Sequence, residues 1–264
     1  MVGNQKICLL TDLDNTMIYS YRRDIGPDKI EVEPYQGRIV SYMTGFAYNA
    51  LEQLRSRILF VPVTTRSAAQ YRRIRFGQDW TPEYALVSNG ATLLVHGQIH
   101  EGWKEESLKL MEGCREQLRR AEEVLLRDLS RTLDVRMVDD LFVFTKSSSP
   151  QSSMERLREA LDTEKVDIAS NGVKVYVIPK TLNKGTAVRR FLDFMGKGRC
   201  EKIFCAGDSE FDVSFLEKGH VIFCPEALLP SFSPLSLQEC EVHGAGEDSV
   251  LSDLVVRRLL EEIQ

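Results

Sequence analysis

The sequence lacks an excess of positive charge. Its 264 residues contain 34 Lys and Arg against 39 Asp and Glu, which gives a formal net charge of −5. The basic residues are spread along the chain. Nucleic-acid binding as a main activity needs a concentrated basic surface that attracts phosphates. The composition therefore argues against nucleic acid as a partner.

Long apolar segments are also missing. No uninterrupted apolar stretch approaches the roughly 20 residues of a membrane span, and no apolar leader precedes the first predicted strand. Six cysteines are present, but none forms a Cys-x-x-Cys pair, and Cys8 and Cys205 lie inside apolar strands. We therefore expect no membrane partner, reduced thiols and residence in the cytoplasm.

The sequence does contain an apolar run that ends abruptly in two carboxylates. Lys6 to Leu10 reads as a buried parallel strand, and Asp12 and Asp14 follow it closely. In doubly wound α/β sheets, residues just past the carboxyl end of such a strand line the ligand crevice. An Asp-x-Asp pair alone arises by chance about once in a chain of this size, so further segments must support the site.

Three such segments follow. A second strand end carries the hydroxyls of Thr64 and Thr65, a helix begins at Lys184, and a third strand ends in Asp208 and Asp212. In this order, the four segments resemble the motifs of the haloacid-dehalogenase (HAD) phosphohydrolase superfamily.

The position of the largest insert refines this resemblance. The insert lies between Thr64 and Lys184 and begins at Ser88-Asn89-Gly90-Ala91. Both features resemble the subgroup with an α/β (type IIB) cap, which includes Cof-type and sucrose-phosphatase-like enzymes and phosphomannomutases. The resemblance implies an α/β fold, with a doubly wound parallel-sheet core over 1–89 and 180–264 and an inserted α/β cap over 90–179.

The resemblance also implies catalytic roles. Asp12 would attack phosphorus and form an aspartyl-phosphate that water later cleaves. Asp14 would act as general acid toward the leaving alcohol and as general base toward water. Thr64, with Thr65 beside it, and Lys184 would bind the oxygens of the phosphoryl group.

Mg²⁺ is the implied cofactor. It needs only a few protein oxygens, because it keeps several of its waters. The resemblance supplies Asp12, the main-chain carbonyl of Asp14, and Asp208 as ligands, with Asp212 behind them. The ion would allow a phosphate to approach the Asp12 carboxylate.

Two positions depart from the superfamily pattern. Thr65 stands where relatives often have Gly, so it could share the role of Thr64. Phe211 stands where Asn usually precedes the final Asp, which removes a polar group near the metal. We expect either weaker Mg²⁺ binding or a larger role for Ser209.

Other patterns predict the surroundings of the site. Segments 30–33 and 38–42 alternate in polarity and predict a hairpin that projects over Asp12 as a flap. A basic helix over 67–75 either meets an anionic substrate or forms a solvated face. One long amphipathic helix is expected over 104–131, followed by two strands, a helix and two strands of the cap.

Three functions are compatible with these features. The first is a Mg²⁺-dependent phosphatase acting on a small phosphorylated metabolite such as a sugar phosphate. A phosphomutase of the phosphomannomutase type would need a second anion pocket, and the cap strands offer only scattered cations: Arg136, Lys146, Lys174 and Lys180. A catalytically silent HAD-like binding module would lack an essential group, yet all the main motif residues are present. Nothing in the sequence indicates an oligomeric state.

Overall fold

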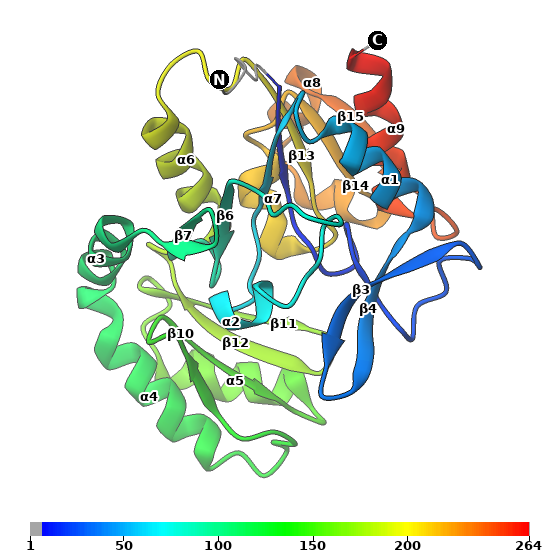
Figure 1. Ribbon diagram of the computed structural model, residues 1–264. Coiled ribbons are helices and arrows are strands. Elements are labelled where there is room, and N and C mark those ends of the chain that lie inside the picture. The colour runs from blue at the N-terminus through cyan, green and yellow to red at the C-terminus, as the bar shows by residue number, and fades with distance from the viewer. Residues whose placement is uncertain (1–6, 264) are drawn as a thin grey trace. The chain divides into compact units, whose positions relative to one another are not determined.

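The computed structural model describes residues 7–263, and Lys6, at which the first predicted strand begins, lies outside them. The chain forms two compact units (Figure 1). The first unit joins two separate segments, Met1–Ile99 and Lys184–Gln264, and the second is His100–Asn183. The second unit therefore begins after residue 99, whereas the sequence predicted the boundary between core and cap after residue 89.

A five-stranded sheet forms the centre of the first unit. Its strands follow the order β15-β14-β13-β1-β5, and every neighbouring pair is parallel. Their bounds are β1 Ile7–Thr11, β5 Leu59–Pro62, β13 Lys202–Ala206, β14 Val221–Pro225 and β15 Glu241–Ala245. β1 lies inside the sheet, where Leu9 pairs with Phe204 on one side and Phe60 on the other. Strands covered on both faces are apolar throughout, which explains the continuous run of β1.

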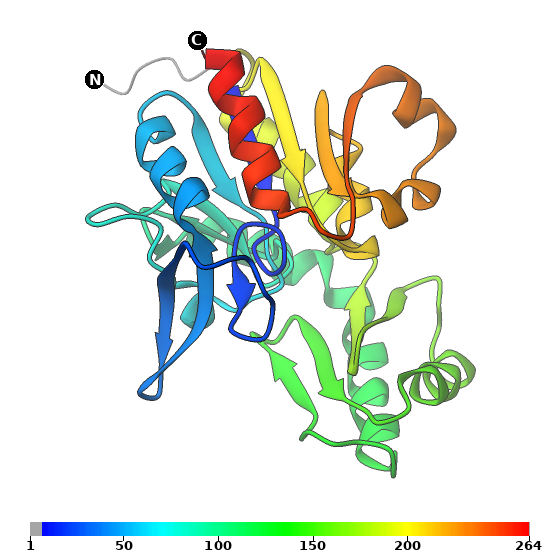
Figure 2. The same cartoon turned by 90° about the vertical axis from the view of Figure 1, so that its right-hand side faces the viewer.

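Helices cover both faces of this sheet. α1 packs against α9 on one side, and α6 packs against α7 on the other (Figure 2). The helices of this unit are α1 Gly45–Leu54, α2 Ala68–Tyr71, α6 Lys184–Met195, α7 Glu210–Leu216, α8 Pro234–Glu239 and α9 Leu251–Ile263, with the 3₁₀ helix Glu226–Ser231 after β14. Thr44 caps α1, because its hydroxyl accepts a hydrogen bond from Ala47 N at 3.0 Å. The predicted doubly wound core is confirmed.

The predicted flap is a β-hairpin. It consists of β3 Lys29–Tyr35 and β4 Arg38–Thr44, with the short β2 Tyr19–Ser20 added beside β4. Gln36 and Gly37 form the turn, and both have positive φ values, 49° and 75°. Such angles suit the two-residue turn that joins twisted antiparallel strands.

Two predictions for the first unit need correction. The helix expected over 67–75 is only the single turn α2, which ends at Tyr71. The sequence from Tyr84 to Ser88 also predicts a third short strand of the core sheet, but the strand β6, Tyr84–Val87, pairs antiparallel with β7 Thr92–Val95, which also pairs with β8 Gln98–Ile99. Among the described residues, β6 joins the end of β5 through a parallel bridge between Val63 and Leu86, with a hydrogen bond from Thr64 N to Leu86 O at 2.8 Å.

The second unit is built on a four-stranded antiparallel sheet with the order β11-β12-β10-β9. The strands are β9 Arg136–Val138, β10 Phe142–Lys146, β11 Val166–Asn171 and β12 Lys174–Pro179. The helices are α3 Glu101–Leu110, α4 Arg115–Leu126 and α5 Pro150–Ala160. The expected repeat of one helix and two strands is present as α4-β9-β10 and α5-β11-β12.

The single helix expected over 104–131 is wrong. The segment is broken into α3, the 3₁₀ turn Glu112–Cys114, and α4. The apolar stripe from which it was inferred is nevertheless buried: Met111, Cys114, Leu118, Ala121 and Leu125. These side chains stay on the buried side of the segment even though the helical hydrogen-bond pattern is interrupted, so the apolar pattern alone does not reveal the break.

A buried carboxylate joins the end of α4 to α5. The Asp128 side chain is 1% exposed and accepts four hydrogen bonds. Its donors are Ser130 N at 2.9 Å, Ser130 Oγ at 2.6 Å, Ser153 Oγ at 2.5 Å and Arg156 Nη2 at 2.9 Å. Burial alone would raise the pKa of Asp128, but the two serines and Arg156 outweigh it and lower the pKa.

All six cysteines are free thiols, as expected. In the range 7–263, no helix has the length and apolar character required to cross a membrane.

Candidate active site

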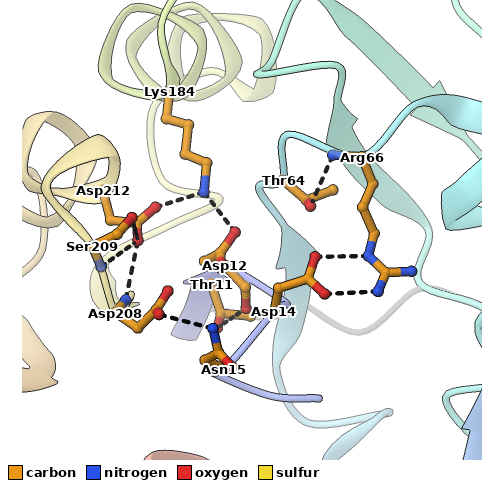
Figure 3. A network of polar contacts seen from close by, with 10 residues as sticks. All are labelled: Thr11, Asp12, Asp14, Asn15, Thr64, Arg66, Lys184, Asp208, Ser209 and Asp212. Atoms are coloured by element: carbon orange, nitrogen blue, oxygen red, sulfur yellow. Dashed lines mark hydrogen bonds and ion pairs between the residues drawn. The ribbon is translucent and has the colours of Figure 1, made fainter. Parts of the chain in front are cut away.

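The candidate site lies where β1, β5 and β13 end. Backbone hydrogen bonds continue past the strands, because Asp12 N donates to Ala206 O at 2.8 Å and Val63 N donates to Thr11 O at 2.7 Å. Since the carboxyl ends of parallel strands meet at one edge of a sheet, the polar residues that follow them come together. Figure 3 shows the resulting network.

Lys184 is the cation at the centre of this network. It begins α6, it is 2% exposed, and its Nζ donates to Asp12 Oδ1 at 2.6 Å and to Asp212 Oδ1 at 2.5 Å (Figure 3). Burial alone would lower the pKa of the ammonium, but the two carboxylates raise it above its ordinary value. Lys184 therefore remains charged and holds one oxygen of Asp12 in place.

The glycine after this lysine allows α6 to approach α7. A Cβ on Gly185 would lie 2.6 Å from the carbonyl oxygen of Ser214, a backbone atom that cannot turn aside. Gly185 N also donates to Ser214 Oγ at 3.1 Å. The close packing of the two helices thus fixes the position from which Lys184 reaches the carboxylates.

Asp212 organises the turn that carries Asp208. Asp212 is fully buried, and its Oδ2 accepts from Asp208 N at 3.0 Å, Ser209 N at 3.0 Å and Ser209 Oγ at 2.9 Å. Ser209 and Asp212 form a capping box at the start of α7. Both oxygens of Asp212 are therefore engaged, one by this cap and one by Lys184. The larger role of Ser209 in place of Asn at position 211 stays a prediction.

The site contains more buried negative charge than positive charge. Oxygens of Asp12, Asp208 and Asp212 lie within 4.8 Å of one another, and Lys184 forms ion pairs with two of them, Asp12 and Asp212. Burial, followed by the neighbouring carboxylates, raises the pKa of Asp12 well above its usual range and that of Asp208 to about 6. Carboxylates clustered in this way bind a hard divalent cation well.

The free oxygens identify which carboxylates fit a cation. Over residues 7–263, no donor reaches Asp12 Oδ2 or Asp208 Oδ1, whereas Asp208 Oδ2 accepts a 3.3 Å hydrogen bond from Asn15. Mg²⁺ prefers such oxygen ligands. The donor set of Asp12 and Asp208 therefore fits Mg²⁺, and Asp212 acts as support behind them.

Asp14 is held by an arginine. Arg66 Nε donates to Asp14 Oδ2 at 2.8 Å and Arg66 Nη2 donates to Asp14 Oδ1 at 2.7 Å, a bidentate pair (Figure 3). The Asp14 side chain is 45% exposed. Arg66 directly follows Thr64 and Thr65 in the sequence, but no local pattern predicts that it binds Asp14.

The two threonines differ in their surroundings. Thr64 is buried, and its hydroxyl oxygen accepts a 3.2 Å hydrogen bond from Arg66 N, which leaves the hydroxyl hydrogen to donate elsewhere. Thr65 is partly exposed on the same turn. Within the described residues its side chain forms no hydrogen bond with the network. The phosphate-binding role of Thr64, with or without Thr65, stays a prediction.

The chain matches a family model and many solved structures. The model describes sucrose-6F-phosphate phosphohydrolase and matches residues 5–223. A sucrose-phosphatase from Synechocystis sp. PCC6803, solved with sucrose and phosphate, has a TM-score of 0.67 and 16% identity, with 97% of this chain and 98% of that chain covered. No protein with a curated function matches significantly.

Two other solved structures have the same fold. The sugar phosphatase BT4131 of HAD subclass IIB has a TM-score of 0.59 and 11% identity, with 97% of this chain and 98% of that chain covered. Trehalose-6-phosphate phosphatase from Aspergillus fumigatus has a TM-score of 0.51 and 13% identity, with 98% and 92% covered. The family match spans most of the chain and confirms the resemblance inferred from the motifs. The chain belongs to the sucrose-6F-phosphate phosphohydrolase family and is a phosphatase of the HAD superfamily.

Proposed function

We propose that this chain is a Mg²⁺-dependent phosphatase that hydrolyses a small sugar phosphate through an aspartyl-phosphate on Asp12. The observation that carries the proposal is the state of the Asp12 carboxylate. Lys184 holds its Oδ1 at 2.6 Å, and no donor among residues 7–263 occupies its Oδ2. The carboxylate is thus held at one oxygen, and its two oxygens together keep lone pairs both for attack on phosphorus and for a cation.

The remaining residues support the two steps of the reaction. The hydroxyl of Thr64 and the ammonium of Lys184 would bind the phosphoryl oxygens. Asp14 would give a proton to the leaving alcohol and later take one from water. Bound by Asp12, Asp208 and the Asp14 carbonyl, Mg²⁺ would supply positive charge that offsets repulsion between the phosphate and Asp12. Asp212 keeps Lys184 and the Asp208 turn in position.

Sugar phosphates are the proposed substrate class because of the family and its structural neighbours. The matching family model is named for a sucrose phosphate, and the neighbours include enzymes named for sucrose phosphate and trehalose 6-phosphate. The four cations that a mutase could use, Arg136, Lys146, Lys174 and Lys180, do not line the pocket that the second unit forms between α4 and α5. A phosphatase is therefore the preferred activity.

Asp12→Asn tests the proposal. The amide is nearly isosteric but is a poor nucleophile and metal ligand, so phosphate release with Mg²⁺ should fall by at least 10³-fold. The assay measures phosphate release from sucrose 6-phosphate, trehalose 6-phosphate, glucose 6-phosphate and p-nitrophenyl phosphate. Rapid acid quenching of the wild type, followed by mass spectrometry, should find a phosphoryl group on the peptide that contains Asp12.

Asp24→Asn is the matched control, because Asp24 is an exposed aspartate on a loop. It should retain wild-type activity. Activity of Asp12→Asn within tenfold of the wild type would exclude Asp12 as nucleophile. Rapid interconversion of glucose 1- and 6-phosphates in the presence of glucose 1,6-bisphosphate would replace the phosphatase proposal with the mutase.

A further inference from the structure

The hairpin carries a buried carboxylate that the reaction as described so far does not use. Glu33 on β3 is 1% exposed. Its Oε2 accepts hydrogen bonds from Ser41 Oγ at 2.7 Å and from Arg66 Nη1 at 2.8 Å. Its Oε1 lies 2.9 Å from Arg73 Nη2. A carboxylate is costly to bury unless it is paired in this way.

An irregularity in the hairpin turns Glu33 inward. Along a regular strand successive side chains face opposite sides, yet Val32 and Glu33 are adjacent and both buried. Between Glu31 and Glu33 the register slips, so that Glu31 lies opposite Tyr42 and Glu33 lies opposite Ser41. Such bulges re-aim side chains and are frequent beside active sites.

Glu33 completes a line of alternating charges that ends at Asp14. The order is Asp14, Arg66, Glu33, Arg73, with all three adjacent pairs between 2.7 and 2.9 Å. Arg66 uses Nε and Nη2 for Asp14 and Nη1 for Glu33. Burial alone would lower the pKa of Arg66, but the two carboxylates raise it above its ordinary value. The Arg66 guanidinium is therefore charged, and Asp14 on one side and Glu33 on the other fix its orientation.

The far end of this line is attached to the hairpin as well. The guanidinium of Arg73 stacks on the ring of Tyr35 at 4.2 Å from the ring centroid. Tyr35 and Glu33 both belong to β3, so Arg73 holds the strand at two points. A planar guanidinium fixed by several partners loses little further freedom when it orients a carboxylate.

We propose that Glu33 is a positioning residue that acts through Arg66 to hold the Asp14 carboxyl in place for proton transfer. This inference rests on the proposed function, because Asp14 is the acid and base only if the chain is a phosphatase of that mechanism. Proton transfer is sensitive to small displacements of the group that performs it. The β3–β4 hairpin would then contribute to catalysis through the Glu33 side chain.

The dependence of the reaction rate on the leaving group distinguishes a positioning role of Glu33 from a purely structural one. A sugar alkoxide leaves slowly without a proton, whereas p-nitrophenolate needs little protonation. Loosening Asp14 should therefore slow a sugar phosphate more than p-nitrophenyl phosphate. A variant that only destabilises the fold would reduce the turnover of both substrates equally.

Glu33→Gln is the principal variant, because it removes the charge and retains the shape. Because Asp14 also serves as base in the hydrolysis step that both substrates share, the measured quantity is kcat/KM, which reports the step in which the alcohol leaves. We expect kcat/KM to fall about 10- to 100-fold on the fastest sugar phosphate of the panel above and less than threefold on p-nitrophenyl phosphate. Glu31→Gln, at an exposed site on the same strand, is the matched control and should match the wild type on both substrates. In an Asp14→Asn background, Glu33→Gln should cause no further loss, because it acts through the missing carboxylate.

Ser41→Ala is the second variant, since Glu33→Gln leaves two arginines facing an amide and could fail to fold. It removes one donor to Glu33 and keeps every charge, and we expect a selective loss of about two- to fivefold on the sugar phosphate. Thermal unfolding confirms that the compared variants are folded at the assay temperature.

Equal losses on the two substrates, no loss in either variant, or an additive loss in the Asp14→Asn background would each overturn the role of Glu33. Failure of the proposed function has a different signature. In that case the wild type releases no phosphate, or Asp12→Asn retains activity, whatever happens at Glu33.

Discussion

Removal of the Lys184 charge tests whether the buried carboxylates depend on it. In Lys184→Met the chain keeps a flexible apolar side chain that can still lie near Phe215, whose ring centroid is 5.7 Å from Nζ. Asp12 and Asp212, with side chains 8% and 0% exposed, then face each other without their cation. We expect a large loss of stability in the first unit.

The magnitude follows from the two ion pairs. At an effective dielectric constant of about 20, each contact near 2.6 Å represents about 6 kcal/mol of Coulomb attraction. Desolvation of the buried ammonium offsets much of this, and removal of one partner of a buried pair typically costs about 3–5 kcal/mol. We therefore expect Lys184→Met to lower the free energy of unfolding by about 3–5 kcal/mol in EDTA. Mg²⁺ should reduce the difference in unfolding free energy between Lys184→Met and the wild type, because it supplies positive charge to the same carboxylates.

Urea unfolding can be followed in the first unit alone. Trp80 packs against Phe60 and Phe76, and the other tryptophan, Trp103, belongs to the second unit. In a Trp103→Phe background, fluorescence therefore reports the unit that contains Lys184.

Lys202→Met is the matched control for Lys184→Met. Lys202 forms a 2.6 Å pair with Glu262, but its side chain is 36% exposed, so its loss should cost about 0–1 kcal/mol. Two results would refute the proposed dependence of the carboxylates on Lys184. One is a loss of unfolding free energy below about 1 kcal/mol for Lys184→Met in EDTA, and the other is a difference from the wild type that is larger in Mg²⁺ than in EDTA.

Asp208→Ala should raise the Mg²⁺ concentration needed for half-maximal activity, with much of kcat recovered at high Mg²⁺; a titration that overlays wild type would remove Asp208 from the ligands. Gly185→Ala should cost about 1–3 kcal/mol in urea unfolding, because its Cβ meets backbone of α7, whereas Gly246→Ala, with open space around it, should be near neutral. Asp128→Asn should cost about 1–3 kcal/mol at pH 7. Folding lowers the pKa of Asp128, so the ionised carboxylate stabilises the folded protein at pH values above its ordinary pKa of 3.8, and this stabilisation is lost as the pH falls through the folded-state pKa. The difference in unfolding free energy between Asp128→Asn and the wild type should therefore shrink in acid. A difference that stays constant with pH would contradict this.

The sequence predicted most of the site because its residues follow strand ends. Asp12, Thr64 and Asp208 each come after an apolar run, and the parallel sheet brings such ends to one edge. Lys184 was inferred from the order of the four motifs and their resemblance to the HAD superfamily, and the structure gives it two carboxylate partners. The strand ends and the order of the motifs were both needed to predict these residues.

Glu33 could not be predicted in the same way. Its burial depends on a slip of register between two strands, and no pattern within β3 marks that slip. The break between α3 and α4 was missed for a related reason, since the apolar stripe continues through it. The strand β15 was also missed, because Glu241 to Ala245 has few apolar residues and forms the edge of the sheet. These features depend on tertiary contacts rather than on local periodicity.

The position of β1 within the sheet constrains the order of folding. β1 is the first described strand to be synthesised, yet one of its two neighbours, β13, follows the whole second unit. At roughly 5–20 residues per second, the ribosome needs on the order of ten seconds to make that intervening segment. During this interval the backbone N–H and C=O groups of β1 that later bond to β13 have no partner strand, whereas the second unit is continuous and can fold first. Slow synthesis and chaperone binding should therefore affect the yield of this protein chiefly through its amino-terminal hundred residues.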